Sequence, residues 1–269
     1  MRVLAPFGRR RAALTGARDV GAYRVLEAAD PDGPRPWPGQ FYMLAAAERW
    51  GAGADERPYL PRAFSFLRAT GGTVAFMLED VGPGTRRLGE LAAGDELWLV
   101  GPLGIGFSPP PAGARALLVG GGVGVPPLAA WADTLAEQGA AGCEALLGFR
   151  DARRAEGARL LDAAPVRVAT DDGSVGHHGL VTELLAQALD ADPAATVYAC
   201  GPRAMLEAVR ALCAERGLHA QLALEAGMAC GFGACYGCAV PLAAGGYARL
   251  CVDGPVLDAG RIDAVPAHA

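Results

Sequence analysis

The sequence contains no lysine, so its basic residues are all arginine. These 24 basic side chains are outnumbered by 29 Asp and Glu, which leaves a formal net charge of −5. A protein that binds nucleic acid needs a basic face for the phosphates. The charge balance therefore argues against nucleic acid as a partner.

The sequence also lacks an apolar run long enough to cross a membrane, which takes about 20 residues. Two long uncharged stretches, 116–132 and 226–248, are interrupted by glycine, proline or cysteine. A secretory signal is missing as well, because the arginines at 9–11 are followed by only a short uncharged stretch, 12–17. We therefore predict a cytoplasmic protein with no membrane partner. Its seven cysteines then favour a metal centre over disulfides.

Four of the cysteines form the motif around which the chain is organised. Four residues separate Cys230 from Cys235, two separate Cys235 from Cys238, and twelve more lead to Cys251. This is the C-x4-C-x2-C…C spacing of a plant-type [2Fe–2S] site, in which two irons need four thiolates. Interspersed glycines allow the tight loop that three of the thiolates require. The motif predicts that all four cysteines are cluster ligands.

Two other interpretations of these cysteines stay open at this point. A structural zinc site is one, although zinc ribbons usually carry two C-x2-C pairs and this chain has one. Disulfide bonds are the other, and they fit poorly with a chain that lacks a secretory signal.

Residues 1–109 have the pattern of an all-β domain, for which we expect a closed antiparallel barrel. Short β-prone segments, such as 22–26, 40–44 and 73–78, alternate with turns rich in glycine and proline. Within this domain, Gly84-Thr85 begins a predicted helix that continues over 86–91. The helix start offers free amides to a phosphate.

Residues 110–218 have the pattern of a Rossmann-like domain with a parallel sheet. Predicted strands over 116–119, 144–147, 166–169 and 196–199 alternate with helices, two of which cover 181–189 and 203–216. The first strand is followed by a glycine turn and a helix to about residue 139, a phosphate-cradling arrangement. Ligands in such sheets lie beyond the carboxyl ends of the strands. The expected nucleotide contacts there are Gly122, Gly124, Asp172, Cys200, Gly201 and Pro202.

Several stretches together resemble the electron transfer subunits of class 1B dihydroorotate dehydrogenase, in the ferredoxin-reductase superfamily. They are Arg62–Ser65, Gly84-Thr85, Gly101–Gly104, Leu118–Gly124, Tyr198–Pro202 and the cysteine loop with the preceding Leu224-Glu225. The order of barrel, nucleotide domain and C-terminal cysteine loop is also that of the family. The resemblance extends from about residue 13 to residue 257.

The resemblance implies a three-part protein: an FAD-binding barrel at 1–109, an NAD-binding domain at 110–218 and a [2Fe–2S] subdomain at 219–269. It implies FAD contacts at Arg62, Ala63, Phe64, Ser65, Met77, Leu78, Glu79, Gly84 and Thr85. Ala63 stands where the family usually has proline, and Met77-Leu78 replaces a more polar pair. No residue is expected to act as a general base.

The implied function is electron transfer in pyrimidine biosynthesis, with NAD as the substrate. A partner subunit that holds FMN oxidises dihydroorotate, and the present chain passes the electrons through its cluster and FAD to NAD⁺. Two of each subunit are expected in the complex. A reductase that serves a hydrogenase, an oxygenase or a ferredoxin would use the same residues. A zinc-stapled interaction protein is the alternative from another functional class.

Overall fold

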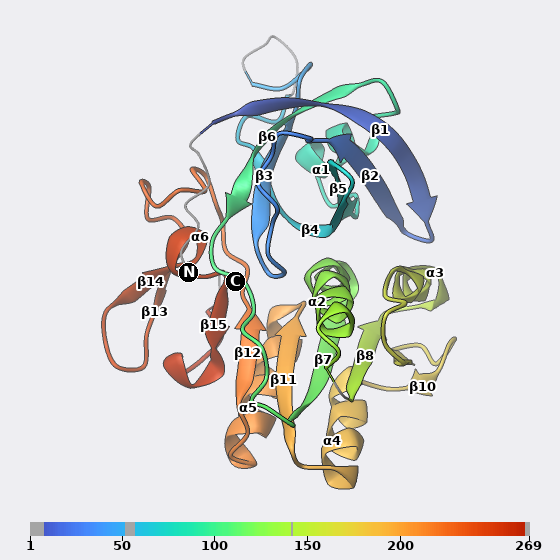
Figure 1. The fold of residues 1–269 in the computed structure, drawn as a ribbon, viewed down its shortest axis with the longest axis vertical. Coiled ribbons are helices and arrows are strands. Elements are labelled where there is room, and N and C mark those ends of the chain that lie inside the picture. Colours follow the sequence, from blue (N-terminus) through green and yellow to red (C-terminus); the bar gives the residue numbers. More distant parts are fainter. Residues whose placement is uncertain (1–7, 52–56, 141, 267–269) are drawn as a thin grey trace.

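The computed structural model describes residues 8–51, 57–140 and 142–266. A β-barrel lies above an α/β domain, and a small C-terminal unit lies beside both (Figure 1). This arrangement confirms the predicted fold class. No helix within these ranges is long and apolar enough to span a membrane.

The barrel is closed by six antiparallel strands in the order β1-β2-β5-β4-β3-β6. Neighbouring residues on a strand point to opposite sides. On β5, Phe76 and Leu78 fill the barrel interior, whereas Met77 faces the α/β domain. The elements are β1 (Arg10–Val20), β2 (Tyr23–Ala29), β3 (Phe41–Ala46), β4 (Arg62–Thr70), β5 (Thr73–Leu78), α1 (Pro83–Gly89) and β6 (Glu96–Leu103). The helix predicted at 86–91 corresponds to α1, which begins earlier, at Pro83, and ends at Gly89.

The α/β domain holds a seven-stranded sheet in the order β10-β9-β8-β7-β11-β12-β15, parallel except for the antiparallel edge strand β15. On β7, Leu117 and Val119 face the side covered by α4 and α5, whereas Leu118 faces α2. The strands are β7 (Arg115–Gly121), β8 (Cys143–Phe149), β9 (Val166–Thr170), β10 (His177–His178), β11 (Ala195–Cys200), β12 (Ala220–Ala223) and β15 (Val256–Asp258). The helices are α2 (Val125–Glu137), α3 (Ala152–Ala155), α4 (Val181–Ala191) and α5 (Arg203–Glu215), with short 3-10 turns at Gly122–Gly124 and Glu156–Leu160.

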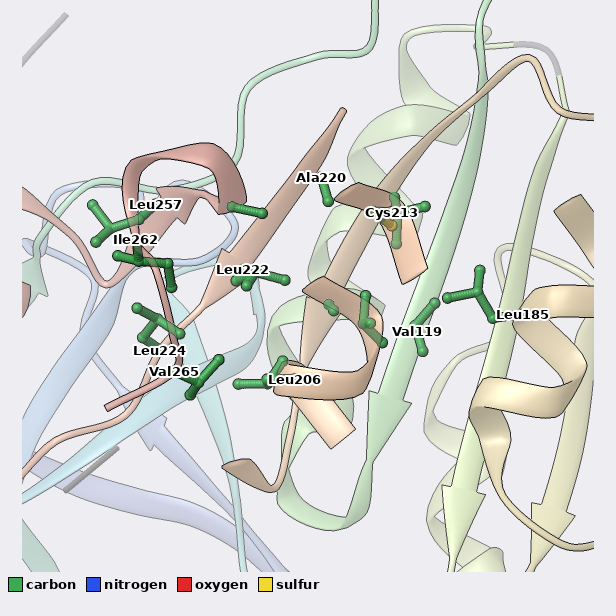
Figure 2. Packing of buried hydrophobic residues seen from close by; sticks show 14 of the residues in the cluster. Val119, Leu185, Leu206, Cys213, Ala220, Leu222, Leu224, Leu257, Ile262 and Val265 are labelled. Carbon is green, nitrogen blue, oxygen red and sulfur yellow. The ribbon is translucent and has the colours of Figure 1, made fainter. Parts of the chain in front are cut away.

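The C-terminal unit shares the core of the α/β domain. It contains the hairpin β13 (Ala239–Pro241) and β14 (Tyr247–Arg249), the short helix α6 (Leu250–Asp253) and a 3-10 turn at Ala259–Arg261. Figure 2 shows Ile262 and Val265 of this unit in one cluster with Leu206, Leu222 and Leu257 of the α/β domain. The buried strand β12 begins at Ala220, just after the predicted division at residue 218, and pairs with β11. The nucleotide sheet therefore continues past that division.

Ion pairs link the barrel to the α/β domain. Arg68 Nε of β4 lies 2.9 Å from Asp133 Oδ2 of α2, and Arg154 Nη2 of α3 lies 2.8 Å from Glu79 Oε1 at the end of β5. The segment between the domains is also held in place, since the Tyr198 hydroxyl donates a hydrogen bond of 2.9 Å to the carbonyl of Ser108. These contacts bring the edge of the barrel against the carboxyl ends of the parallel strands.

Candidate cofactor and electron-transfer site

Two clefts meet where the barrel contacts the α/β domain. The cleft on the barrel side has a volume of about 680 Å³, and the cleft at the strand ends has a volume of about 650 Å³. Four residues line both: Glu79, Val81, Val123 and Glu225. A ligand in one cleft would therefore lie directly beside a ligand in the other.

The barrel cleft gathers most of the residues predicted to contact FAD. Seven of them line it: Arg62, Ala63, Phe64, Ser65, Met77, Glu79 and Thr85. The side chain of Leu78 does not, because strand alternation turns it into the barrel core. Sequence motifs alone did not reveal that the opposite wall consists of residues 224–229, which precede the first cluster cysteine.

Arg62 and Gly84 are in contact at the barrel cleft. A Cβ atom on Gly84 would lie 2.5 Å from Arg62 Nε, so the guanidinium occupies space that only a glycine leaves free. The Thr85 hydroxyl accepts hydrogen bonds from the amides of Val81 and Gly82, at 2.9 and 3.0 Å. Thr85 thus satisfies two amides that precede α1, and the cation of Arg62 lies beside this turn.

The glycine turn after β7 forms part of the strand-end cleft. Gly122 lines the cleft, but Gly124 lies behind it, since a Cβ atom there would be 2.0 Å from the carbonyl oxygen of Cys200. Gly201 and Pro202 also line the cleft. Cys200 itself is buried, and burial raises the pKa of its thiol well above the usual range. It is therefore a packing residue and not an ionised nucleophile.

Two acidic residues follow β9 in a turn, and their side chains lie in different surroundings. Asp172 accepts hydrogen bonds from the amide and the hydroxyl of Ser174, which lower the pKa of its carboxyl and close the turn. Its neighbour Asp171 lines the strand-end cleft instead, together with Arg150 and Arg154. The motif alone did not show which of the two neighbouring carboxylates lines the cleft.

Glu225 belongs to a stretch that resembles the family, but the sequence assigned it no role, and the structure makes it a functional candidate. Its side chain lies on the wall shared by the two clefts and faces their open space. The surrounding protein removes water from its carboxyl, and this desolvation raises the pKa of the carboxyl above the ordinary value. The signal in the sequence was a charged residue two positions after the end of the buried strand β12, at the edge where ligands lie in such sheets.

The cysteine loop folds into a nest of backbone amides. Of the four consecutive N–H groups at 232–235, three donate to the sulfur of Cys230, and that of Gly233 donates to the sulfur of Cys251. Burial opposes ionisation of Cys230, but these hydrogen bonds, with one from the Cys235 side chain, lower the pKa of the Cys230 thiol to about 6. The loop therefore stabilises negative charge on the sulfur of Cys230. Burial and the neighbouring Cys238 side chain raise the pKa of the Cys251 thiol to about 12, although the Gly233 amide opposes this shift.

The four cysteines are arranged as two pairs. The sulfurs of Cys238 and Cys251 are 3.2 Å apart, and the side chains of Cys230 and Cys235 are hydrogen-bonded to each other. A [2Fe–2S] cluster needs two thiolates for each iron, so the donor set fits this group. All seven cysteines are free thiols, and 3.2 Å is far from the disulfide length of about 2.05 Å. Within the described ranges, no three His, Cys, Asp or Glu side chains are grouped as a single zinc ion would need.

The comparisons with known proteins agree with this geometry. Residues 225–263 match the model of the iron–sulfur cluster binding domain of dihydroorotate dehydrogenase B. The chain is 34% identical to the dihydroorotate dehydrogenase B (NAD(+)) electron transfer subunit of Desulforamulus reducens, over 84% of this chain and 86% of that protein. It is 39% identical to the protein of the same name from Geobacillus thermodenitrificans, with the same coverage.

Solved structures support the fold. An NADH-dependent reduced ferredoxin-NADP oxidoreductase superposes with a TM-score of 0.79 at 24% identity, covering 95% of this chain and 91% of that one. Phthalate dioxygenase reductase gives 0.58 at 20% identity, covering 76% and 64%. With the family model and the relatives in agreement, the chain belongs to the electron transfer subunits of NAD(+)-dependent dihydroorotate dehydrogenase B, as its motifs predicted.

Proposed function

We propose that this chain conducts electrons from a dihydroorotate-oxidising subunit to NAD⁺, through a [2Fe–2S] cluster in the cysteine loop and FAD in the barrel cleft. The observation that carries the proposal is the continuity of the three sites. Ala229 lines the barrel cleft and the next residue, Cys230, belongs to the cysteine loop, while Glu225 touches both clefts. Electron carriers in these positions would lie close together in one row.

The residues of the barrel cleft suit a flavin dinucleotide. Phe64 and Met77 offer apolar surface for a flat ring system, and Ser65 offers a hydroxyl. Arg62 supplies a cation for a pyrophosphate at the Gly84 turn. FAD, when bound, supplies the exchange between single electrons and a hydride. The protein itself orients the ring and keeps the neighbouring cleft open for the nicotinamide.

The residues of the strand-end cleft suit a nicotinamide dinucleotide. Gly122 and Gly201 allow the close backbone approach that phosphates need. Asp171 places a carboxylate in the same cleft, where it can accept a hydrogen bond from a ribose hydroxyl. Glu79 and Asp151 both pair with Arg154. A paired arginine is less available to a 2′-phosphate. Because the relatives are also named for NAD(+), we propose NAD and not NADP as the substrate.

The partner of this chain is a separate catalytic subunit. The relatives are named as electron transfer subunits, so a catalytic subunit completes the complex. We propose that this subunit holds FMN, oxidises dihydroorotate to orotate in pyrimidine synthesis, and assembles with this chain two to two. The cytoplasm is the proposed compartment, because its reducing conditions keep cluster cysteines as thiols.

The test combines the purified chain with the FMN-containing subunit from the same organism. We expect the chain alone to carry about two irons and two sulfides and to reduce artificial acceptors with NADH. Only the mixture should form NADH from dihydroorotate. Cys235→Ser should abolish this coupled reaction and spare most of the NADH-dependent acceptor reduction.

Two results would contradict the proposal. Full coupled turnover in Cys235→Ser would show that the cluster is not on the electron path. A chain that binds FAD and reduces acceptors but forms no complex with the FMN subunit would instead be a reductase for another acceptor, such as a ferredoxin or an oxygenase.

A further inference from the structure

Arg249 reaches from β14 back to the cysteine loop. Its Nη1 donates a hydrogen bond of 3.0 Å to the carbonyl oxygen of Gly233, and its guanidinium lies 5.1 Å from the ring centroid of Tyr236. The Asp253 carboxylate holds its other end, 3.0 Å from the Arg249 amide and 3.5 Å from Nε. The side chain is half-buried, with 31% of it exposed. Its contacts with the Gly233 carbonyl, the Tyr236 ring and the Asp253 carboxylate fix its position.

The Gly233 carbonyl belongs to the same peptide unit as the N–H of Ala234. That N–H is one of the three amides that donate to the sulfur of Cys230. The Arg249 cation therefore acts on one end of a peptide group whose other end touches a cluster ligand. Hydrogen bonds arranged in a chain polarise one another, so the cation strengthens the bond to the sulfur.

The second contact of Arg249 lies at the strained point of the loop. Tyr236 lies between Cys235 and Cys238 and has a φ of 59°, a left-handed conformation that residues with a Cβ atom rarely adopt. Its ring is 62% exposed, and the guanidinium of Arg249 lies over it. This cation–π contact holds the two-residue bridge between the cysteines in the shape that the ligands need.

We propose that Arg249 is a positioning residue for the [2Fe–2S] cluster, which holds the loop closed on the cluster and raises its reduction potential. The proposal rests on the function proposed above. Reduction adds a negative charge to the cluster, and a nearby cation with its polarised peptide stabilises that charge more than the oxidised state. Loss of the cation should therefore make the cluster harder to reduce and easier to lose.

The experiment compares Arg249→Gln and Arg249→Lys with the wild type, with Arg261→Gln as the control. Arg261 is an exposed arginine of the same C-terminal unit, so the control loses the same charge away from the loop. Three quantities are measured on the full chain: iron per protein, the rate of iron release to a chelator, and the midpoint potential from an EPR-monitored redox titration. These measurements need neither the partner subunit nor turnover.

In Arg249→Gln we expect iron release to be about 10-fold faster. We expect the ratio of reduced to oxidised cluster at a fixed potential to fall about 10-fold, a shift of about 59 mV to more negative potential. Arg249→Lys keeps the charge but not the planar fork, and should lie between Gln and the wild type in both quantities. Arg261→Gln should behave as the wild type.

The proposal is overturned if Arg249→Gln matches the Arg261→Gln control in both release rate and potential, or if Arg249→Lys departs from the wild type as far as Gln does. If Arg249→Gln takes up no iron, Arg249→Lys decides. A Lys variant that takes up iron would then support the role of the cation, and a Lys variant without iron would refute the proposal. A wild-type chain without a [2Fe–2S] signal would refute the proposed function itself, which separates the two failures.

Discussion

At the scale of single residues, the barrel cleft depends on one cation placed against one glycine. Arg62 lies where a side chain at position 84 would be, so both residues are needed for the same contact. A hydrogen bond to a charged group contributes about 1.5–3 kcal/mol. We expect Arg62→Ala to weaken FAD binding about 10- to 100-fold, measured by fluorescence titration of the flavin-free protein.

The control for this prediction is Arg18→Ala. Arg18 is an exposed arginine on β1 that lies outside both clefts. Gly84→Ala should reproduce the effect of Arg62→Ala, because its methyl group would displace the guanidinium. Equal FAD affinity in Arg62→Ala and Arg18→Ala would show that the cation does not contact the cofactor.

Glu225 leads to a prediction about pH. A carboxyl whose pKa is raised by folding destabilises the folded protein as pH rises above the unfolded value, about 4.3. The penalty is complete once pH exceeds the folded pKa. We therefore expect Glu225→Gln to raise the Tm of the flavin-free protein at pH 7 and to leave it unchanged at pH 4. The rise should not exceed about 2 °C, because the open cleft screens the charge.

Thermal unfolding followed by circular dichroism at both pH values checks this expectation. Glu215→Gln removes an exposed carboxylate from the end of α5 and is the matched control. An equal rise at pH 4 and pH 7 would mean that the substitution acts through packing and not through the charge.

At the scale of secondary-structure elements, the strand-end cleft depends on how closely α2 approaches β11. Gly124 precedes α2, and a methyl group there would lie 2.0 Å from the carbonyl oxygen of Cys200. Gly124→Ala should therefore push the turn and the helix start away from the sheet. We expect a loss of about 1–3 kcal/mol in the free energy of unfolding and a higher KM for NADH.

Urea unfolding and NADH-dependent reduction of an artificial acceptor measure the two effects. Gly89→Ala serves as the control, because its methyl group would meet only Leu78 Cδ1 at an ordinary 3.7 Å. If Gly124→Ala were as stable and as active as Gly89→Ala, the close approach of α2 to β11 would not matter for the cleft.

At the scale of the whole molecule, the two clefts stay adjacent only if the domains keep their relative position. The Arg154–Glu79 pair joins α3 to the end of β5, with side chains 30% and 22% exposed. Arg154→Ala should lower the free energy of unfolding by about 1 kcal/mol. It should also loosen the domains, which makes the linker around 109–114 more sensitive to limited proteolysis.

Arg159→Ala is the control for this pair, because Arg159 pairs with Glu156 inside the same domain. Equal cleavage rates in the two variants would show that the Arg154–Glu79 pair does not hold the domains together.

Much of the site could be predicted because its chemistry requires certain residue types at short spacings. The cysteine spacing, the Arg62–Ser65 segment and the glycine turn at 122 are local patterns, and all of them line or form the sites described above. The direction of individual side chains was harder to predict. Leu78 points into the barrel, and Asp171 rather than Asp172 lines the cleft. On the extended strand β5, a shift of one residue reverses a side chain. After β9 the chain is in a turn, and the hydrogen bonds from Ser174 hold the Asp172 carboxylate there.

Local composition and spacing predicted the order of the domains and singled out the four cysteines, and the resemblance of short motifs indicated the family. The folded chain was needed to reveal that Glu225 stands between the two clefts, that Arg249 reaches the Gly233 carbonyl, and that β12 and β15 extend the nucleotide sheet. These features join segments that lie far apart along the chain. They follow from how the barrel, the sheet and the C-terminal unit bury their apolar surfaces against one another, which no short pattern encodes.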